Sequence, residues 1–351
     1  MGDSKKGVRL IPREVEPSQQ FDLFSELVTE KCDVLSNTFH LWNIIPRYIF
    51  TPQFQTELRD KQGKADPYTY SFEHHQSQKK YEITYAPVPI KQKGGKFLAC
   101  FPGAAEELVE EALVRLLTLR NGGSVHDVAR SETWVEFSLG SIKRELESVG
   151  RGKNLDQIKR SIEILSGCVI DVQVNGKRYF RGTIMQDLYS VNRDRYLDDP
   201  NGLNYCRLPA FISYSIDNYK FRQFNFERLM GCDHQLSRWI YRHMIDNWTQ
   251  AQRSSGQTFH ISVERNIKRS GLLQRAREND NRTKVAEAMN ELVQRGVIAK
   301  FNVRSIKDSS DKRKIVDVIY EDIVVGAHFA REQIAANVRD KAIKKKTGRS
   351  A

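Results

Sequence analysis

WVEFSLGSIKRELESVGRGKNLDQIKRSIEILSGCVIDVQVNGKRYFRG, residues 134–182, carries the densest succession of secondary-structure signals in this chain. Its first four residues predict a short strand, and Ser138 is a preferred N-cap residue for the helix that follows. A glycine-rich turn leads to a second helix at 155–166. The Asn175-Gly176 pair between two apolar stretches predicts a tight β-hairpin.

The same succession returns nearer the C-terminus. The second copy has a helix at 232–248, a strand at 258–262, a helix at 263–270, a turn from Gly271, a helix at 280–294 and a hairpin from Val297 to Glu321. A long helix that begins near Ala104 precedes the first copy. Helix, strand, helix, turn, helix and hairpin is the order of a winged helix. We therefore predict an α+β fold with two tandem winged-helix domains, preceded by an N-terminal adaptor segment.

Apolar spacing supports the duplication. In the third helix of each copy, three apolar residues share one helical face and predict the side that packs on the core. These are Ile158, Ile162 and Leu165 in the first copy, and Val285, Met289 and Leu292 in the second. Each helix is followed at once by a Val-Ile strand and a hairpin.

The chain of 351 residues is long enough for two domains or a little more. We expect an N-terminal adaptor or flexible segment at 1–80, winged-helix domains at 81–215 and 216–326, and a basic C-terminal helix and tail at 327–351. The polar run at 56–82 is expected to be an exposed or mobile connection. After it, YEITYAPVPI and FLACF flank the turn KQKGGK and predict a short β element. The helix near Ala104 is predicted from the spacing of Leu108, Ala112, Leu116 and Leu119.

Composition favours a polyanionic partner. The chain has 56 Lys and Arg against 44 Asp and Glu, a net charge of +12. A basic solvated surface is the alternative. The sequence shows no apolar stretch of membrane-spanning length and no signal-peptide core, which predicts a cytoplasmic protein. The five cysteines are scattered without paired spacing, so no disulfide framework or structural zinc is expected.

The outward face of each third helix offers groups suited to DNA. Arg and Lys pair well with guanine, Asn and Gln with adenine, and Glu accepts a hydrogen bond from cytosine. The residues predicted to read DNA are Lys153, Asn154, Gln157 and Arg160 in the first copy, and Asn281, Arg282, Thr283, Lys284 and Glu287 in the second. A merely solvated polar face is the alternative for each.

Cations also gather at the predicted wings, where a protruding hairpin reaches phosphate or the minor groove. They are Lys177, Arg178 and Arg181 in the first wing, and Lys307, Lys312, Arg313 and Lys314 in the second. Charges that protect an exposed strand edge are the alternative. The tripeptide Ile-Lys-Arg recurs on three predicted helices, with an apolar anchor beside two cations. Phosphate contacts are predicted for Lys143, Arg144, Lys268 and Arg269 as well as for Arg160.

Catalytic motifs are absent from the sequence. There is no phosphate-binding loop of the G-x-x-x-x-G-K-[ST] type. His74-His75 and His260 lack the spacing of a nicking enzyme's metal site, and Asp198-Asp199 precedes a turn that these residues shape. We therefore expect a protein that is not an enzyme and needs no cofactor or metal, although a primase or nickase remains the alternative from another class.

Across about residues 80–325 the order of elements resembles plasmid replication initiators of the TrfA and RepC kinds, most closely in the stretches at 136–172 and 178–188. The resemblance implies a protein that binds direct repeats at an origin, helps to open an AT-rich segment and recruits the host helicase machinery. It also implies a possible monomer–dimer equilibrium. A winged-helix transcriptional regulator, or a plasmid partition or copy-control protein, is the alternative on the same scaffold.

A second resemblance lies near the N-terminus. QFDLF at 20–24 is similar to the Q-x-[DS]-L-F peptide by which bacterial replication proteins bind the sliding clamp, which would place Gln20, Asp22, Leu23 and Phe24 in that contact. The alternative is the apolar face of a helix that continues through Leu27 and Val28. At the other end, the cations of the tail are expected to add nonspecific affinity for the DNA backbone or to remain disordered; they are Lys341, Lys344, Lys345, Lys346 and Arg349.

Overall fold

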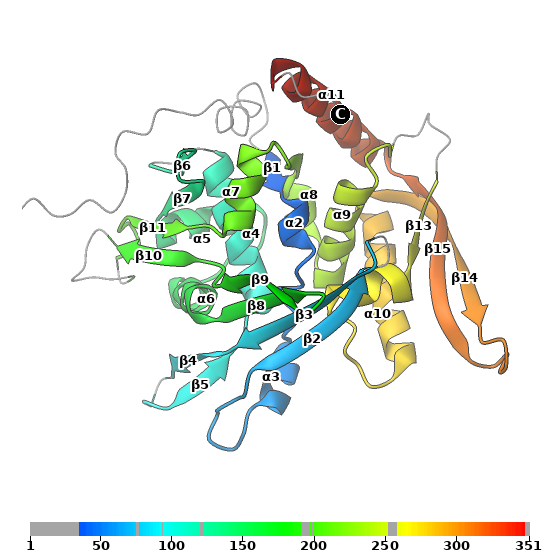
Figure 1. Ribbon diagram of the computed structural model, residues 1–351, viewed down its shortest axis with the longest axis horizontal. Helices are drawn as coiled ribbons and strands as arrows, with labels where there is room; N and C mark the ends of the chain where they lie inside the picture. Colours follow the sequence, from blue (N-terminus) through cyan, green and yellow to red (C-terminus); the bar gives the residue numbers. More distant parts are fainter. Residues whose placement is uncertain are drawn as a thin grey trace, which may run out of the picture.

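The computed structural model describes residues 35–74, 77–92, 94–119, 123–190, 197, 199–251 and 258–347 (Figure 1). Within these ranges, no helix combines the length and the apolar composition needed to cross a membrane. The chain forms two winged-helix units, each with its own buried core, so the predicted α+β fold with tandem winged helices is confirmed.

The first unit contains more elements than a minimal winged helix. In chain order they are β1 (Leu35–Thr38), α2 (His40–Asn43), α3 (Pro52–Leu58), β2 (Tyr68–His74), β3 (Lys79–Ala86), β4 (Val88–Lys91), β5 (Phe97–Cys100), α4 (Ala104–Thr118), β6 (Val125–Asp127), β7 (Glu132–Phe137), α5 (Leu139–Ser148), α6 (Leu155–Gly167), β8 (Val169–Val174), β9 (Lys177–Gly182), β10 (Gln186–Ser190), β11 (Asn204–Arg207) and α7 (Ala210–Asp217). Its winged helix is formed by α4, β7, α5, α6, β8 and β9.

The second unit is shorter. It follows β12 (Arg222–Asn225) and α8 (Phe226–Gly231), and consists of α9 (Gln235–Asn247), β13 (Phe259–Ser262), a π-helical turn (Val263–Ile267) that runs into a 3-10 turn (Lys268–Ser270), α10 (Glu278–Gln294), β14 (Ile298–Lys307) and β15 (Ile315–Val325). The last helix, α11, spans Ala327–Thr347. The helix predicted at 263–270 is thus helical but irregular.

Local signals in the sequence produce the expected elements. The Ser138 hydroxyl accepts a hydrogen bond from the backbone N–H of Ser141 at the start of α5. Asn175 and Gly176 join β8 to β9 with φ angles of 51° and 75°, the left-handed backbone that a two-residue hairpin turn requires. The two predicted apolar stripes are fully buried, as their spacing predicts.

The strand order differs between the units. In the second, β13 pairs with β15 and β15 with β14, so the strand after the first helix joins the wing. In the first, β7 pairs instead with β6 and β11, and the wing hairpin β8–β9 is extended by β3 and β2 into a four-stranded sheet.

The polar run at 56–82 is not the exposed connection predicted from its composition. It contains α3 in part and the whole of β2, which pairs with β3 from Tyr68↔Tyr85 to His74↔Lys79. Tyr68, Tyr70 and Phe72 alternate with exposed residues and pack against the first core. Apolar residues recur at every second position in this stretch, as a half-buried strand requires, but its many polar residues favoured an exposed connection.

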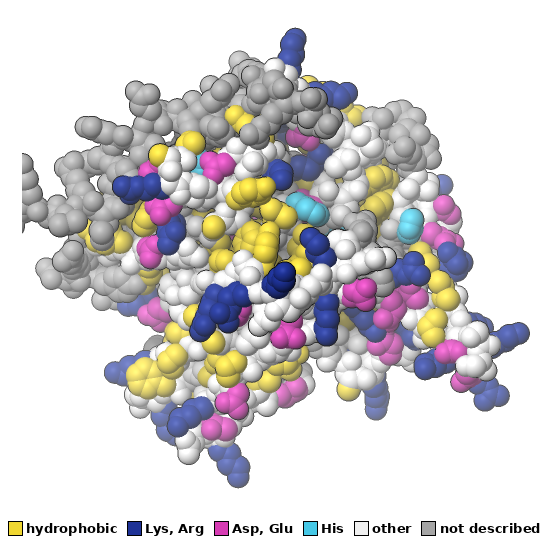
Figure 2. Space-filling model, in the orientation of Figure 1, with side chains coloured by type: hydrophobic (Ala, Val, Ile, Leu, Met, Phe, Trp, Pro, Cys, Tyr) yellow, Lys and Arg dark blue, Asp and Glu magenta, His cyan; other side chains and the backbone are white. Residues whose placement is uncertain are grey.

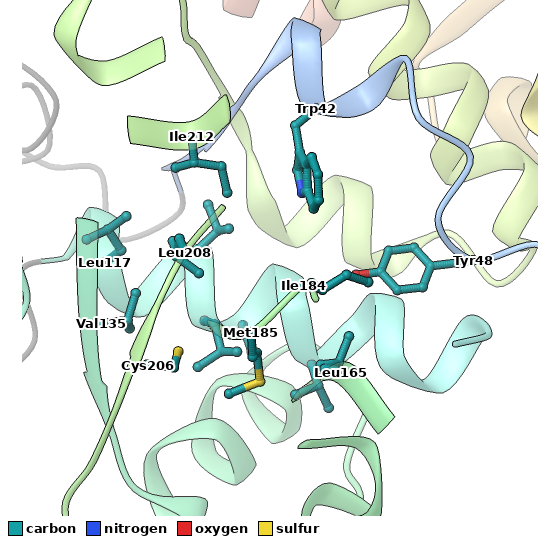
Figure 3. Packing of buried hydrophobic residues seen from close by; sticks show 14 of the residues in the cluster. Trp42, Tyr48, Leu117, Val135, Leu165, Ile184, Met185, Cys206, Leu208 and Ile212 are labelled. Atoms are coloured by element: carbon teal, nitrogen blue, oxygen red, sulfur yellow. The ribbon is translucent and has the colours of Figure 1, made fainter. Parts of the chain in front are cut away.

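The expected adaptor at 1–80 is also corrected, because its described part from residue 35 belongs to the first unit. Trp42, Tyr48 and Phe50 are buried in the same core as Val135 of β7 and Leu165 of α6. Figure 3 shows Trp42 and Tyr48 beside residues of the winged helix. Large aromatic side chains explain this docking, since each removes much apolar surface from water.

The expected boundary at 215 falls inside α7, whose Ile212 and Ile216 lie in the first core. The two cores meet near β12 and α8 instead, where Phe226 belongs to the first and Phe224 to the second. The predicted C-terminal helix is confirmed as α11, and it is docked: Asp340 pairs with Arg222 of β12 at 2.8 Å.

Candidate nucleic-acid interface

A buried ion cluster joins the two units. Helix α4 of the first unit carries Glu107, Glu110 and Glu111 on neighbouring turns, and all three side chains are buried. Arg238 and Arg242 of α9, in the second unit, both pair with Glu107, with a distance of 2.7 Å for Arg238 Nη2 to Glu107 Oε2. Carboxylates so deep in a fold require partners, because desolvating a charge is costly.

The other two carboxylates extend the cluster. Arg242 Nη1 lies 2.6 Å from Glu111 Oε1. Glu110 pairs with Arg47 at 2.8 Å and accepts hydrogen bonds from Tyr48 Oη and Trp42 Nε1, each at 2.6 Å. Residues of the segment before α3 therefore complete the cluster on the side of the first unit.

The electrostatics of the carboxylates differ. Burial alone would raise the pKa of Glu107, but the Arg238 and Arg242 guanidinium groups hold it below its usual value. Burial raises the pKa of Glu111 to about 7, because Glu110 and Glu107 oppose the effect of Arg242. Removing one member of such a cluster leaves a buried charge uncompensated, so the cluster fixes how the two units sit relative to each other.

The third helix of each winged helix is held on its unit by a similar buried bond. In the first unit, Ser161 of α6 donates to Glu106 of α4 at 2.8 Å. In the second, Ser237 of α9 donates to Glu291 of α10 at 2.5 Å. The serine and glutamate have exchanged helices, but both bonds join the first helix of the winged helix to its third.

The outward face of α6 is as the sequence predicts. Asn154, Gln157 and Arg160 are exposed, and Lys153 is half-buried. Asn154 and Gln157 also cap the helix, since each side-chain oxygen accepts the other's backbone N–H, at 2.8 Å and 3.1 Å. Their amide NH₂ groups remain the atoms available for reading a base.

The outward face of α10 departs from prediction at one residue. Asn281 is only 3% exposed, and its side-chain amide holds the preceding loop by bonds to the backbone N–H and C=O of Arg275. Its assignment as a base-reading residue is wrong, because its polar atoms are already used inside the fold. Thr283 and Glu287 are exposed, and Arg282 is half-buried with a hydrogen bond to the carbonyl of Ile315.

Lys284 is more enclosed than its position on the helix suggests. Its ammonium group donates to the carbonyl of Leu272 at 2.8 Å, and burial lowers its pKa. It lines a groove of about 810 Å³ between α3 and the loop before α10.

The wing cations lie where predicted. Lys177, Arg178 and Arg181 are exposed on β9, and Arg178 pairs with Asp171 at 2.9 Å. Lys307, Lys312, Arg313 and Lys314 are exposed around the β14–β15 turn. That turn is shaped by Asp308, which accepts hydrogen bonds from both the backbone N–H and the hydroxyl of Ser310.

The three Ile-Lys-Arg tripeptides share a buried isoleucine, but their cations differ in environment. Ile142, Ile158 and Ile267 are all fully buried anchors. Lys143 and Arg144 lie on the surface of α5, and Lys268 forms ion pairs with Glu264 and Glu278.

Arg269 is different. Its guanidinium donates to His243 Nδ1 at 2.8 Å, lies over the Trp239 ring, and has a pKa lowered by burial. It packs at the junction of the two units, so its predicted phosphate contact is not supported by its position.

Two exposed arginines that the sequence prediction did not include, Arg275 and Arg277, lie in the turn before α10. The R-A-R pattern just ahead of the predicted helix was the available signal. With other exposed lysines and arginines they form what we term the cationic edge. Its members are Lys61 and Lys64 after α3, Lys91 and Lys96 on β4–β5, Arg275 and Arg277, and the four cations of the β14–β15 turn. These loops lie along the lower edge of the molecule in Figure 1, where Lys and Arg side chains protrude in Figure 2.

In the part of the chain that the structure describes, no group of three His, Cys, Asp or Glu side chains is placed to hold a metal ion. The predicted clamp-binding residues Gln20, Asp22, Leu23 and Phe24 lie outside the described residues.

No family model matches the sequence, and no curated protein matches it. Solved structures similar to this one include a selenomethionine derivative of domains 2 and 3 of RctB, at 11% identity and a TM-score of 0.47, covering 77% of this chain and 95% of that chain. A second structure of RctB domains 2–3 has 12% identity, a TM-score of 0.44, and coverages of 80% and 97%. The Pi initiator protein in complex with iteron DNA has 12% identity, a TM-score of 0.34, and coverages of 83% and 98%.

One of these structures is of an initiator protein, the class of protein that the order of elements resembles. At these identities and TM-scores, the similarities assign neither a contact nor an activity to this chain.

Proposed function

We propose that this protein is a sequence-specific DNA-binding replication initiator of the plasmid type. The observation that carries the proposal is the arrangement of two winged-helix units, held together by the buried ion cluster, with exposed DNA-reading side chains on α6 and α10. Winged helices of this kind read DNA by placing the third helix in the major groove. Two units in a fixed arrangement favour a site of two adjacent groove segments.

Electrostatics support the same conclusion. The net charge is +12, and the cationic edge passes over both units. Lysines and arginines that neutralise phosphates release counterions and supply the nonspecific part of DNA affinity. The cationic edge would bind the DNA backbone, while α6 and α10 contact the bases.

The role at an origin rests on the resemblance in element order to TrfA- and RepC-like initiators. On this proposal the protein binds direct repeats, promotes opening of an adjacent AT-rich segment and recruits host replication proteins. It acts by binding and needs no cofactor.

A footprint on the DNA flanking its own gene tests this. We expect protection of several direct repeats, each long enough for two groove segments, beside an AT-rich stretch that becomes permanganate-sensitive. A single protected palindrome without melting would favour a transcriptional regulator or copy-control protein instead. Protection too short for more than one unit would contradict the tandem binding mode.

Recruitment of the sliding clamp is proposed from the sequence alone. Leu23 and Phe24 of the QFDLF peptide would fill an apolar pocket on the clamp and Gln20 would orient the peptide. Burying one such side chain is worth roughly 1.5 to 3 kcal/mol, so Leu23→Ala with Phe24→Ala should abolish a micromolar association. A pull-down with purified clamp measures this. If the double variant also melts at a lower temperature than the parent, these residues belong to a folded core and the motif is abandoned.

A further inference from the structure

The hairpin β4–β5 stands beside the DNA-reading helix of the first unit and has no part in the winged helix itself. Val88–Lys91 pairs with Phe97–Cys100, and the turn between them contains Gly94 and Gly95 with φ angles of 107° and 84°. Only glycine adopts such values without strain, so the two glycines permit a tight, protruding turn.

The base of the hairpin is fixed on α6. Ile90 and Cys100 form a small buried cluster with Ile164 of α6. Arg160, a predicted DNA-reading residue, reaches Gln92 Oε1 at 3.4 Å and Cys100 Sγ at 3.5 Å. The hairpin is therefore packed directly against α6.

The outer edge of the hairpin is paired as well. The backbone N–H of Ala99 donates to the carbonyl of Gly63 at 2.8 Å, and Arg59 Nε donates to the carbonyl of Ala99 at 2.6 Å. These bonds cover the outer edge of β5, so that edge is not open for strand addition near the base of the hairpin.

The tip combines an exposed aromatic ring with cations. Phe97 is 55% exposed and lies directly across the hairpin from Lys91. Lys96 is exposed next to it, and Lys61 and Lys64 are exposed on the loop that braces β5. Figure 2 shows hydrophobic and basic side chains together over β4 and β5.

We propose that the β4–β5 hairpin is a DNA-binding arm, in which Lys91 and Lys96 contact phosphates and Phe97 packs into the minor groove next to the segment read by α6. The inference rests on the proposed DNA-binding function and adds a site to it. An apolar side chain flanked by cations is the combination that minor-groove proteins use to wedge and unstack a base step. In an initiator, this would assist the opening of the duplex.

A protein partner fits the tip less well. Stable protein interfaces need several hundred Å² of complementary surface on each side, with few charges at the centre. At the tip, by contrast, a single aromatic ring is surrounded by lysines. This positive charge is complementary to a polyanion.

The test uses the full-length protein and a duplex carrying the footprinted site, with 2-aminopurine at the adjoining A·T pairs. For Lys91→Ala with Lys96→Ala, the slope of log affinity against log salt should fall by nearly 2, about 0.9 for each phosphate that is no longer neutralised. For Phe97→Ala, the slope should stay unchanged while the rise in 2-aminopurine fluorescence on binding is abolished. Phe97→Leu keeps an apolar wedge and should retain most of that signal.

Val128→Ala is the matched control, because Val128 is an exposed apolar residue in the turn between β6 and β7, to which no DNA contact is assigned. It should keep both the slope and the fluorescence signal. If the hairpin variants bind and unstack DNA like the parent while Arg160→Ala weakens binding, the arm is refuted and the proposed function stands. If the parent itself fails to bind the duplex, both are refuted. Melting temperatures of all variants should match the parent, and a lowered value for Phe97→Ala would make the ring part of the fold and overturn its assignment to DNA.

Discussion

The two winged-helix units have the same order of elements but build different sheets from them. In the second unit β13 completes the wing sheet as a third strand next to β15. In the first, the corresponding strand β7 pairs with β6 and β11, and two strands from the N-terminal segment, β3 and β2, take the place beside the wing. The first wing is therefore one part of a larger sheet, whereas the second is a long hairpin that protrudes.

The difference shows which parts of a winged helix are local. The order of helices and hairpin follows from neighbouring residues and is the same in both units, although the details differ: Asn154 caps α6, whereas no side chain caps α10 at Arg277. The strand that pairs with the edge of the wing depends on which segment offers a matching apolar face. In the first unit that segment lies about 90 residues earlier in the chain, as in the pair Tyr81↔Val174. Sheet pairing over such separations leaves no local trace.

The largest expected effect comes from breaking the buried ion cluster that joins the two units. Arg242→Ala leaves Glu107 and Glu111 buried without their shared partner, which should destabilise the protein by about 3 to 5 kcal/mol. Urea unfolding followed by circular dichroism measures this destabilisation.

Two controls sharpen that measurement. Arg304→Ala removes a pair between Arg304, which is 56% exposed, and Glu321, and should cost at most about 1 kcal/mol. Arg242→Met combined with Glu111→Gln removes one pair, keeps the Arg238–Glu107 pair and should recover part of the stability. An Arg242→Ala variant as stable as the parent would show that the units are not held by this cluster.

The next effect concerns pH. Because burial raises the pKa of Glu111 from its usual 4.5 to about 7, the folded protein holds a proton that the unfolded chain releases. Stability from this group is full below pH 4.5 and is lost as pH rises towards 7, by up to roughly 3 kcal/mol. Glu111→Gln should therefore become more stable relative to the parent between pH 5 and 8.

Glu107→Gln is the matched control on the same helix. The arginines hold the pKa of Glu107 below its usual value, so its contribution is present above pH 4.5 and is lost only in acid. Because Glu107 also helps to raise the pKa of Glu111, Glu107→Gln should gain stability relative to the parent between pH 5 and 8, but by less than Glu111→Gln does. A parallel pH profile for both variants would refute the assignment of the proton to Glu111.

A smaller effect separates α6 from α10. Asn281→Ala leaves two backbone groups of Arg275 without their partner inside the fold, and should cost about 2 kcal/mol of stability and loosen the loop before α10. Asn154→Ala removes an exposed N-cap of α6 and should cost about 1 kcal/mol. Thermal unfolding compares them, and equal decreases in stability would contradict the different roles assigned to these residues.

The sequence was sufficient for the elements that depend on near neighbours. The stripes of Ile158 and Val285, the cap at Ser138 and the turn at Asn175 were all predictable from spacing and residue type. The exposed wings and most of the reading faces follow from the same periodicity. These are the parts of the candidate site that lie on single helices or hairpins.

The junction and the buried asparagine were not predictable. Glu107 and Glu111 of α4 are paired with arginines more than 120 residues away, and the spacing of Leu108, Ala112, Leu116 and Leu119 describes only one side of a helix that is covered all round. Asn281 has the helical position of a reading residue, but the loop before α10 folds over it. Both depend on tertiary packing, which overrides local pattern.

The smallest effect distinguishes the two wings, and it follows from how each hairpin is built. At the protruding second wing, Lys312→Ala with Arg313→Ala should weaken binding to cognate and random DNA alike and lower the salt slope by nearly 2. In the first wing, Arg178 is already paired with Asp171 at 2.9 Å, so DNA must replace an existing ion pair and the gain is smaller. Lys177→Ala with Arg178→Ala should therefore lower the slope by only about 1. Titrations at several salt concentrations, on both duplexes, give the two slopes. Equal slopes would mean that both wings meet the backbone in the same way and that the sheet built by β2 and β3 does not alter the first wing's contact with DNA.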